Sequence, residues 1–426
     1  MRNIIHQSAA VFAIISVCHG VGLFLLGPHM ANDSRWYSDA ADHLIAYGFN
    51  YRTYLERTDS SIPPLFYLSF VTLLAVCKKL FGDYWQYGVL AMHLVADSLV
   101  GAQLVSLVRR LTRISSAAWV ALVLYLVCFD IFNWSRQMLS DATFLLVSFS
   151  IFFLIAGAFL RDQPGRPWGH QVGVAVLLLL ALVSRPTSLV LCLPVAGTAI
   201  LWWRRRATPD QPLQLHPGVL GTFALLAVAA TLAYASVMQN IRLWPWPALS
   251  DLLRLPYYSG LYSQGEVVSA RLYTYLPPPA TLLDYVAISA TRFFYFFAFF
   301  LPYGFSPGHN LIMAIFFVPT YALAVVGLYG FIRRRAGLDG RGEAVVAISV
   351  AFIVTFAFFH AHTEVDFDWR YRLPIIPHLI LLAAVGVATW RERSNPHEAL
   401  SEGLRPCPGD EAKSHSRKAS QMKRGT

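Results

Sequence analysis

The chain has 426 residues, of which 56% are hydrophobic and only 14% are charged, and its formal net charge is +10. Soluble domains carry roughly 25% charged residues, so this composition excludes an ordinary soluble enzyme. The basic residues stand in short clusters between long apolar runs, where they indicate orientation in a membrane rather than binding to nucleic acid.

Long apolar runs recur from the N-terminus to about residue 392. A run of about 18 apolar residues can cross the hydrocarbon core as a helix, because a helix satisfies its backbone hydrogen bonds internally. The sequence therefore predicts an all-α protein, a polytopic transmembrane helix bundle of about ten spanning helices. In chain order they are expected at residues 4–26, 86–108, 115–132, 141–160, 170–184, 187–203, 217–238, 311–332, 344–361 and 373–390.

Clusters of arginine predict the orientation, because basic residues are enriched in cytoplasmic loops. These clusters lie at residues 109–113, 161–166, 204–206, 333–335 and 391–393. Both termini are then expected in the cytoplasm. We expect a multi-pass protein of the inner (plasma) membrane of the cell.

Two further apolar stretches, 65–81 and 285–301, are predicted to be interfacial helices on the outer face. The loop before residue 65 is predicted outside and the cluster at residue 109 inside, so an odd number of helices must cross the membrane between them. The first stretch is short and carries Lys78 and Lys79, and the second contains Arg292. If both stretches entered the membrane, the number of crossings would be about twelve.

The domain prediction is simple. Residues 1–392 are expected to form one transmembrane domain, and residues 393–426 a disordered, basic cytoplasmic tail with little to bury. The first apolar run is longer than the core of a signal peptide and lacks a good cleavage site, so we interpret it as a retained helix. The five cysteines show neither metal-ligand nor disulfide-framework spacing.

Polar residues in tightly anchored outer loops are costly, which makes them candidates for function. In the loop after the first span, Asp33, Tyr37, Ala41 and Leu44 recur at helical spacing and are expected to share one face. Asp33 stands where the short helix begins, so it could instead be only the N-cap of that helix.

Two more candidates follow further along the chain. Asp141 opens the predicted helix 141–160 from the outer side, where a carboxylate is favoured by the helix dipole even without a function. Arg185 lies between two apolar runs, where it must pair, bind an anion or extend to the interface. An anion-binding arginine and a plain interfacial arginine both fit this position.

The last candidate stretch contains Arg370 and Arg372, just before the final predicted span. Guanidinium groups suit phosphate oxygens better than ammonium groups do. The preceding residues alternate imidazole and carboxylate side chains, which are ordinary metal ligands, although a solvated loop has the same composition. They are His360, His362, Glu364, Asp366 and Asp368.

Together these motifs resemble a known family. Asp33-x-x-x-Tyr37-x-x-x-Ala41 is followed by Pro-Pro-Leu-Phe-Tyr at 63–67 and Leu-Phe-Gly at 80–82, and later by Arg185-Pro186. The Arg-Tyr-Arg-Leu-Pro sequence at 370–374, with Pro377, completes the set. This order is similar to that of glycosyltransferase family C, in the bacterial branch of dolichyl-phosphate-mannose-protein mannosyltransferase-like and aminoarabinose transferase-like enzymes. The resemblance covers most of residues 1–392.

The resemblance implies an inverting glycosyltransferase that takes a hexose or pentose from a polyprenyl-phosphate donor on the outer (periplasmic) face. Asp33 matches the family's catalytic acidic residue in the first loop, and its carboxylate would be the general base for the acceptor hydroxyl. The remaining matched side chains would bind substrate, with the arginines neutralising the departing lipid phosphate. They are Tyr37, Asp141, Arg185, Arg292, Arg370 and Arg372.

The chain also departs from the family pattern. Many members carry an acidic pair at the first-loop position, whereas Ser34 follows Asp33 here, and Asp39 and Asp42 compete for the role of base. No cofactor is expected, and a divalent metal stays open. The expected partners are the donor, membrane lipid and an acceptor that is a glycan, a lipid or a protein. A flippase for a lipid-linked glycan is the alternative function, although it would more often show repeated halves.

Overall fold

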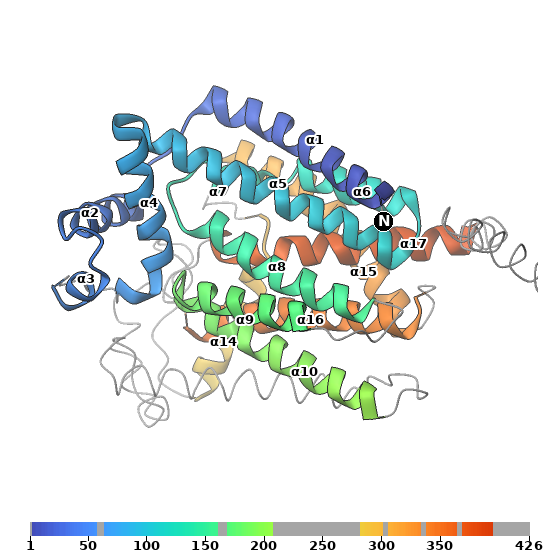
Figure 1. The fold of residues 1–426 in the computed structure, drawn as a ribbon. Coiled ribbons are helices and arrows are strands. Elements are labelled where there is room, and N and C mark those ends of the chain that lie inside the picture. The colour runs from blue at the N-terminus through green and yellow to red at the C-terminus, as the bar shows by residue number, and fades with distance from the viewer. Residues whose placement is uncertain are drawn as a thin grey trace, which may run out of the picture.

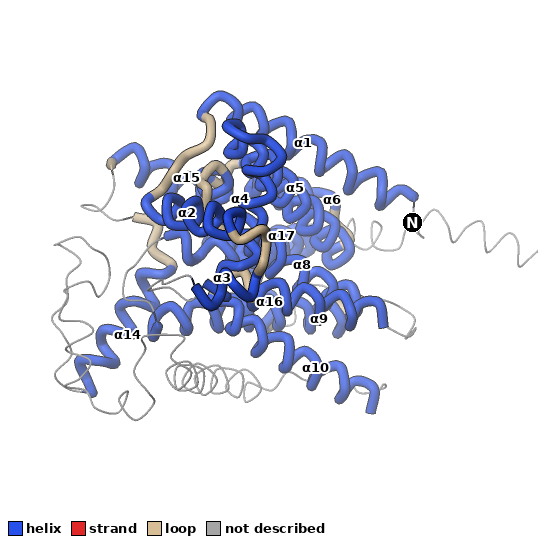
Figure 2. Tube along the Cα trace, turned by 60° about the vertical axis from the view of Figure 1, so that its left-hand side comes forward, coloured by secondary structure: helices blue, strands red, loops and turns tan. Residues whose placement is uncertain are grey.

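The computed structural model describes residues 2–57, 64–160, 168–207, 282–300, 306–333, 338–363 and 369–394. Within these ranges the regular structure is helical, with one isolated bridge between His29 and Gln137. Figure 2 shows the same part of the chain as helices joined by loops. The all-α prediction is therefore confirmed.

The N-terminal half contains ten α-helices and three short 3₁₀ helices within the described residues. They are α1 (Arg2–Leu26), α2 (Asn32–Ala46), α3 (Tyr51–Arg57), η1 (Pro64–Tyr67), α4 (Leu68–Phe81), η2 (Gly82–Tyr84), α5 (Trp85–Thr112), α6 (Ser115–Leu126), α7 (Phe129–Ser135), α8 (Asp141–Phe159), α9 (Trp168–Leu182), η3 (Pro186–Leu191) and α10 (Cys192–Ala207). The C-terminal part adds α14 (Leu282–Phe296), α15 (Pro307–Ile332), α16 (Gly340–Thr363), η5 (Trp369–Ile375) and α17 (Ile376–Ser394).

The long helices run roughly side by side, and the short helices α2 and α3 gather with α4 at one end of them (Figure 1). The start of α1 and the end of α17 lie at the opposite end (Figure 1). The basic residues Arg109 and Arg110 end α5, and Arg391 near the end of α17 donates a hydrogen bond to Ser116 at the start of α6. The predicted arginine clusters on these helices thus share one end of the bundle.

Apolar packing forms one large core and one small one. The large core lies among α5, α6, α8, α15, α16 and α17, whose inward side chains are almost fully buried. The small core lies where α2 packs on α4, and it buries Tyr37, Ala41 and Leu44 against Phe70 and Leu74. The predicted shared face of α2 is therefore present, because residues three and four apart stand on one side of a helix.

The predicted number of about ten spans is not confirmed. Six described helical stretches are long and apolar enough to cross a membrane, and a seventh is added if the bent pair α6–α7 counts as one span. The described helix α9 is shorter than a full span, because Pro186 disfavours helical backbone at Arg185 and cannot donate a backbone hydrogen bond. The predicted span 217–238 and the tail from residue 395 lie outside the described residues.

The predicted span 115–132 is broken rather than straight. Helix α6 ends at Leu126, and α7 begins at Phe129 with a bend of 46°. The apolar pattern runs on through the bend, so periodicity alone predicted a continuous helix. After the break, Asp130 of α7 contacts Arg372 of η5, and Arg136 just after α7 accepts a backbone hydrogen bond from His29 in the loop before α2.

The two stretches predicted to be interfacial form helices. Helix α4 crosses the direction of α5 after a turn at Gly82, whose φ of +54° suits a glycine (Figure 1). Helix α14 packs against α16. Their location at the membrane surface remains a prediction.

Helices α15 and α17 approach each other through glycine. A Cβ on Gly386 would collide with the carbonyl oxygen of Leu323, and one on Gly327 with the carbonyl oxygen of Leu382. Small residues that let two backbones approach closely are the usual basis of tight helix pairing in membranes. This crossing therefore holds α17, and with it η5, firmly against α15.

We predict that Gly386→Ala destabilises the protein by roughly 1–3 kcal/mol, because the added methyl group forces the two helices apart. Thermal unfolding in detergent measures the effect. The matched control is Gly157→Ala in α8, where an added Cβ meets nothing within 4 Å. Equal melting temperatures for the two variants would contradict the proposed close packing.

Candidate active site

The site begins with a contact between residues that are 337 positions apart. Nη1 of Arg370 in η5 donates a hydrogen bond of 2.6 Å to Oδ2 of Asp33 in α2. Ala31, not Asp33, is the N-cap residue of α2, so Asp33 lies within the first turn with its carboxylate turned to η5. The Asp33 side chain is 48% exposed and that of Arg370 is 19% exposed, so an incoming molecule can reach this pair.

Tyr371 lies between two guanidinium groups. Its hydroxyl accepts a hydrogen bond of 3.0 Å from Nη2 of Arg370, and its ring lies 5.0 Å from the Arg370 guanidinium carbon and 5.8 Å from that of Arg185. His360, near the end of α16, stacks on the same ring at 4.8 Å. The aromatic ring therefore keeps Arg185 and Arg370 close together while separating their like charges.

Arg185 is paired with Asp141 at the start of α8. Both side chains are more than 90% buried, and Nη1 of Arg185 contacts Oδ1 of Asp141 directly. Burial alone would lower the pKa of the Arg185 guanidinium, but the Asp141 carboxylate raises it above its ordinary value. Among the described residues, Nε of Arg185 has no hydrogen-bond partner, so this cation keeps one donor for another group.

Tyr37 belongs to an aromatic cluster beside this pair. Its ring meets those of Trp36, Tyr67 and Phe70 edge-on, at centroid distances of 5.0 to 5.2 Å for all three pairs. Burial raises the pKa of the Tyr37 phenol well above its ordinary value, so the hydroxyl stays protonated. The cluster gives the site an apolar wall at the N-terminal half of α2.

Arg372 has a different environment from Arg370, although only one residue separates them. It is fully buried, and its Nε and Nη2 lie 2.9 and 2.8 Å from Oδ2 of Asp130 in α7. Its guanidinium also lies over the rings of Phe317 and Trp369, at 4.0 and 4.6 Å. This arginine is thus held by groups of the protein itself.

A family model described as dolichyl-phosphate-mannose-protein mannosyltransferase matches residues 63–234. The chain carries a domain of this mannosyltransferase family. It is therefore a multi-pass membrane glycosyltransferase with the family C fold that uses a lipid-phosphate sugar donor. No curated protein and no solved structure matches the chain.

The match of the mannosyltransferase family covers only part of the assembled site. Asp141 and Arg185 lie within residues 63–234, whereas Asp33 and Arg370 lie before and after them. The structure nevertheless brings these two pairs together around Tyr371. The remaining predicted residue, Arg292, is buried on α14, a helix that packs on α16 and touches η5.

Sequence reasoning missed two features of this candidate site. Asp130 was passed over inside an apolar run, although a lone carboxylate there demands a partner and so signals a buried contact. His360 was grouped with a possible metal-binding loop. In the structure His360 stacks between Tyr371 and Phe296, at 4.8 and 5.5 Å.

Metal binding has no support from the described part of the chain, where no three side chains of His, Cys, Asp or Glu gather as ligands. Residues 364–368, with three of the carboxylates considered as ligands, lie outside the described ranges.

We predict that Asp130→Asn destabilises the protein by about 3–5 kcal/mol, because it leaves the buried Arg372 cation without its counter-charge. The double variant Asp130→Asn/Arg372→Gln should recover much of this loss. Denaturant unfolding in detergent measures the free energy of unfolding of the single and the double variant. A double variant that is stable yet no longer binds the donor would show that Arg372 itself contacts the phosphate.

Proposed function

We propose that this glycosyltransferase inverts the anomeric centre, with Asp33 as general base and with Arg370 and Arg185 receiving the lipid phosphate. The observation that carries the proposal is the direct contact between the Asp33 carboxylate and the Arg370 guanidinium. A base and a phosphate-binding cation thus meet at one point of the surface.

The chemistry needs both groups. The acceptor hydroxyl oxygen forms a bond to the anomeric carbon while the bond from that carbon to the phosphate oxygen breaks. Asp33 takes the hydroxyl proton, and the polyprenyl phosphate leaves with the electron pair of the broken bond. Guanidinium groups stabilise the negative charge that develops on this phosphate.

The present distance of 2.6 Å describes a resting arrangement. Attack from the side opposite to the phosphate requires the base and the cation to stand roughly 8–10 Å apart, with the hydroxyl, the anomeric carbon and the phosphate oxygen between them. The donor phosphate would therefore replace Asp33 as the partner of Arg370. The same exchange frees the carboxylate to accept a proton.

The other matched residues support the donor. Among the described residues Nε of Arg185 has no hydrogen-bond partner, and the guanidinium groups of Arg185 and Arg370 lie 5.8 and 5.0 Å from the same Tyr371 ring. We propose that both cations contact one phosphate. Asp141 holds Arg185, and the protonated Tyr37 hydroxyl can donate to a sugar oxygen. We propose that Arg372 and Arg292 support the site without contacting the substrate. Arg372 does so by fixing η5 through its contact with Asp130.

We place the site on the outer face, with both termini in the cytoplasm. Asp33 and Arg370 lie at the end of the bundle with α2, and the arginines that end α5 and α17 lie at the other end (Figure 1). Positive residues favour the cytoplasmic side. We further propose that the protein lies in the inner membrane of the cell and that the acceptor hydroxyl belongs to a glycan, a lipid or a protein.

Asp33→Asn should lower kcat by at least about 100-fold while leaving donor binding largely intact, because the amide cannot take up the proton. The purified enzyme in detergent is incubated with a panel of polyprenyl-phosphate sugars, and products are identified by mass spectrometry and their anomeric configuration by NMR. The matched control is Asp39→Asn, an exposed carboxylate of the same helix.

Retained turnover in Asp33→Asn would remove the proposed base, and a retained anomeric configuration would remove the inverting mechanism. The alternative function, a flippase for a lipid-linked glycan, forms no new glycosidic bond. Absence of product from the unmodified protein with every donor would favour that alternative.

Sidedness can be tested with single cysteines in a cysteine-free background. A cysteine replacing exposed Asp39 should react with a membrane-impermeant maleimide added to intact cells, because α2 is proposed to lie outside. A cysteine replacing exposed Arg110 should react only after the membrane is opened. The reverse labelling pattern would place the site on the cytoplasmic face.

A further inference from the structure

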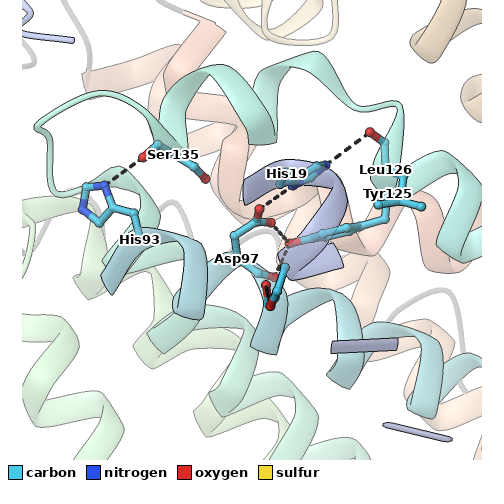
Figure 3. Close-up of polar contacts among 8 residues, drawn as sticks. His19, His93, Asp97, Tyr125, Leu126 and Ser135 are labelled. Atoms are coloured by element: carbon cyan, nitrogen blue, oxygen red, sulfur yellow. Dashed lines mark hydrogen bonds and ion pairs between the residues drawn. The ribbon is translucent and has the colours of Figure 1, made fainter. Parts of the chain in front are cut away.

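A buried polar network lies outside the site, between α1, α5 and α6 (Figure 3). Nδ1 of His19 lies 2.5 Å from Oδ2 of Asp97, and the Tyr125 hydroxyl donates to Oδ1 of Asp97 at 2.6 Å. The Nε2 of His19 lies 3.3 Å from the backbone carbonyl oxygen of Leu126. His19 and Asp97 are almost completely buried.

The geometry determines the protons in this network. A carbonyl oxygen can only accept, so Nε2 of His19 carries a hydrogen toward Leu126. A second proton lies between Nδ1 and the Asp97 carboxylate, so the pair is neutral as a whole. Since each polar atom of the pair is satisfied, the network is stable without water.

Leu126 is the last residue of α6, where helix carbonyl groups lack partners within the helix. His19 supplies one such partner and thereby supports the break before α7. A second buried histidine acts at the other end of α7, where Nδ1 of His93 donates to the carbonyl oxygen of Ser135 at 3.0 Å (Figure 3). Two histidines from different helices therefore hold the backbone just before α7, at Leu126, and at its last residue, Ser135.

Helix α7 and the residues just after it contact both η5, which carries Arg370, and the loop that leads to Asp33. Asp130 in α7 holds Arg372 and so η5. Just after α7, His29 of the α1–α2 loop donates its backbone N–H to the carbonyl oxygen of Arg136, and its carbonyl oxygen accepts from the N–H of Met138. These two backbone bonds place the loop that leads to Asp33.

We infer that His19 and His93 are positioning residues for sugar transfer, because they fix α7 and α7 fixes Asp33 relative to Arg370. Neither histidine needs to touch substrate. A displacement of the reacting groups by about 1 Å can lower the rate by up to about 100-fold. A change at His19 or His93 is therefore expected to lower the rate of sugar transfer. This inference rests on the proposed function, in which Asp33 and Arg370 act together.

The first test is His93→Phe, which keeps a ring to stack on Phe70 (at 6.0 Å from His93) but removes the hydrogen bond to Ser135. We expect kcat to fall on the order of tenfold, with KM for the polyprenyl-phosphate sugar and the melting temperature little changed. His19→Phe should lower kcat similarly, and His19→Gln, which retains a donor, should restore part of it.

Ser16→Ala is the matched control, because Ser16 donates to Ser98 at 2.8 Å and links the same helices α1 and α5 without touching α6 or α7. Its turnover should equal that of the unmodified enzyme. The double variant His19→Phe/His93→Phe should lose less than the product of the single losses, because both residues act through one segment.

Unchanged kcat in both His93→Phe and His19→Phe, or losses that multiply in the double variant, would overturn the inference. If His19→Phe does not fold, Tyr125→Phe replaces it, since it removes the hydroxyl that lies 2.6 Å from Oδ1 and 2.8 Å from the backbone carbonyl oxygen of Asp97 and keeps the His19–Asp97 pair. Asp33→Asn is measured in parallel. An active Asp33→Asn enzyme would refute the proposed base, whereas an inactive one beside fully active histidine variants would refute only the positioning roles.

Discussion

An ionised side chain away from water needs a partner, and this requirement joins distant parts of the chain. Four polar contacts link segments that are far apart in the chain, and three of them are buried. They are Asp33 with Arg370, Asp141 with Arg185, Asp130 with Arg372, and His19 with Asp97. Each contact couples an early segment to a later one, so the charged groups determine which ends of the helices meet.

The 3₁₀ helix η5 shows how the pairing of charged side chains positions the residues of the site. Arg372 turns inward to Asp130 and is fully buried, while Arg370 turns to Asp33 near the surface. The inner arginine anchors the segment, and the outer one stays partly exposed. One short segment thus supplies both a rigid attachment and a group that can exchange its partner for a phosphate.

Much of this arrangement could be predicted from the sequence, because it depends on local patterns. Continuous apolar runs predicted the helices, and the order of motifs predicted that Asp33 and Arg370 belong together. The break between α6 and α7 could not be predicted, because the apolar pattern continues through it and the histidine that supports it lies 107 positions away in the chain. The end of α9 was placed two residues too late, since α9 ends at Leu182 and only Pro186 interrupts the apolar run in the sequence.

The predicted role of Arg372 illustrates a second limit. Arginines one residue apart look equivalent in the sequence, and both suit phosphate. Only the three-dimensional structure shows that Asp130 and the rings of Phe317 and Trp369 surround one of them. Pairing of buried charges depends on contacts between residues far apart in the chain, and a single sequence does not reveal those contacts.

The glycine crossing of α15 and α17 has a consequence for how the enzyme admits its donor. Two helices whose backbones touch cannot slide or separate without losing that fit. The crossing of α15 and α17 therefore holds η5 and Arg370 rigidly. Helix α2 rests on the smaller core and meets η5 through a partly exposed ion pair. A small displacement of α2 would therefore separate the Asp33 carboxylate from Arg370 without disturbing the crossing of α15 and α17.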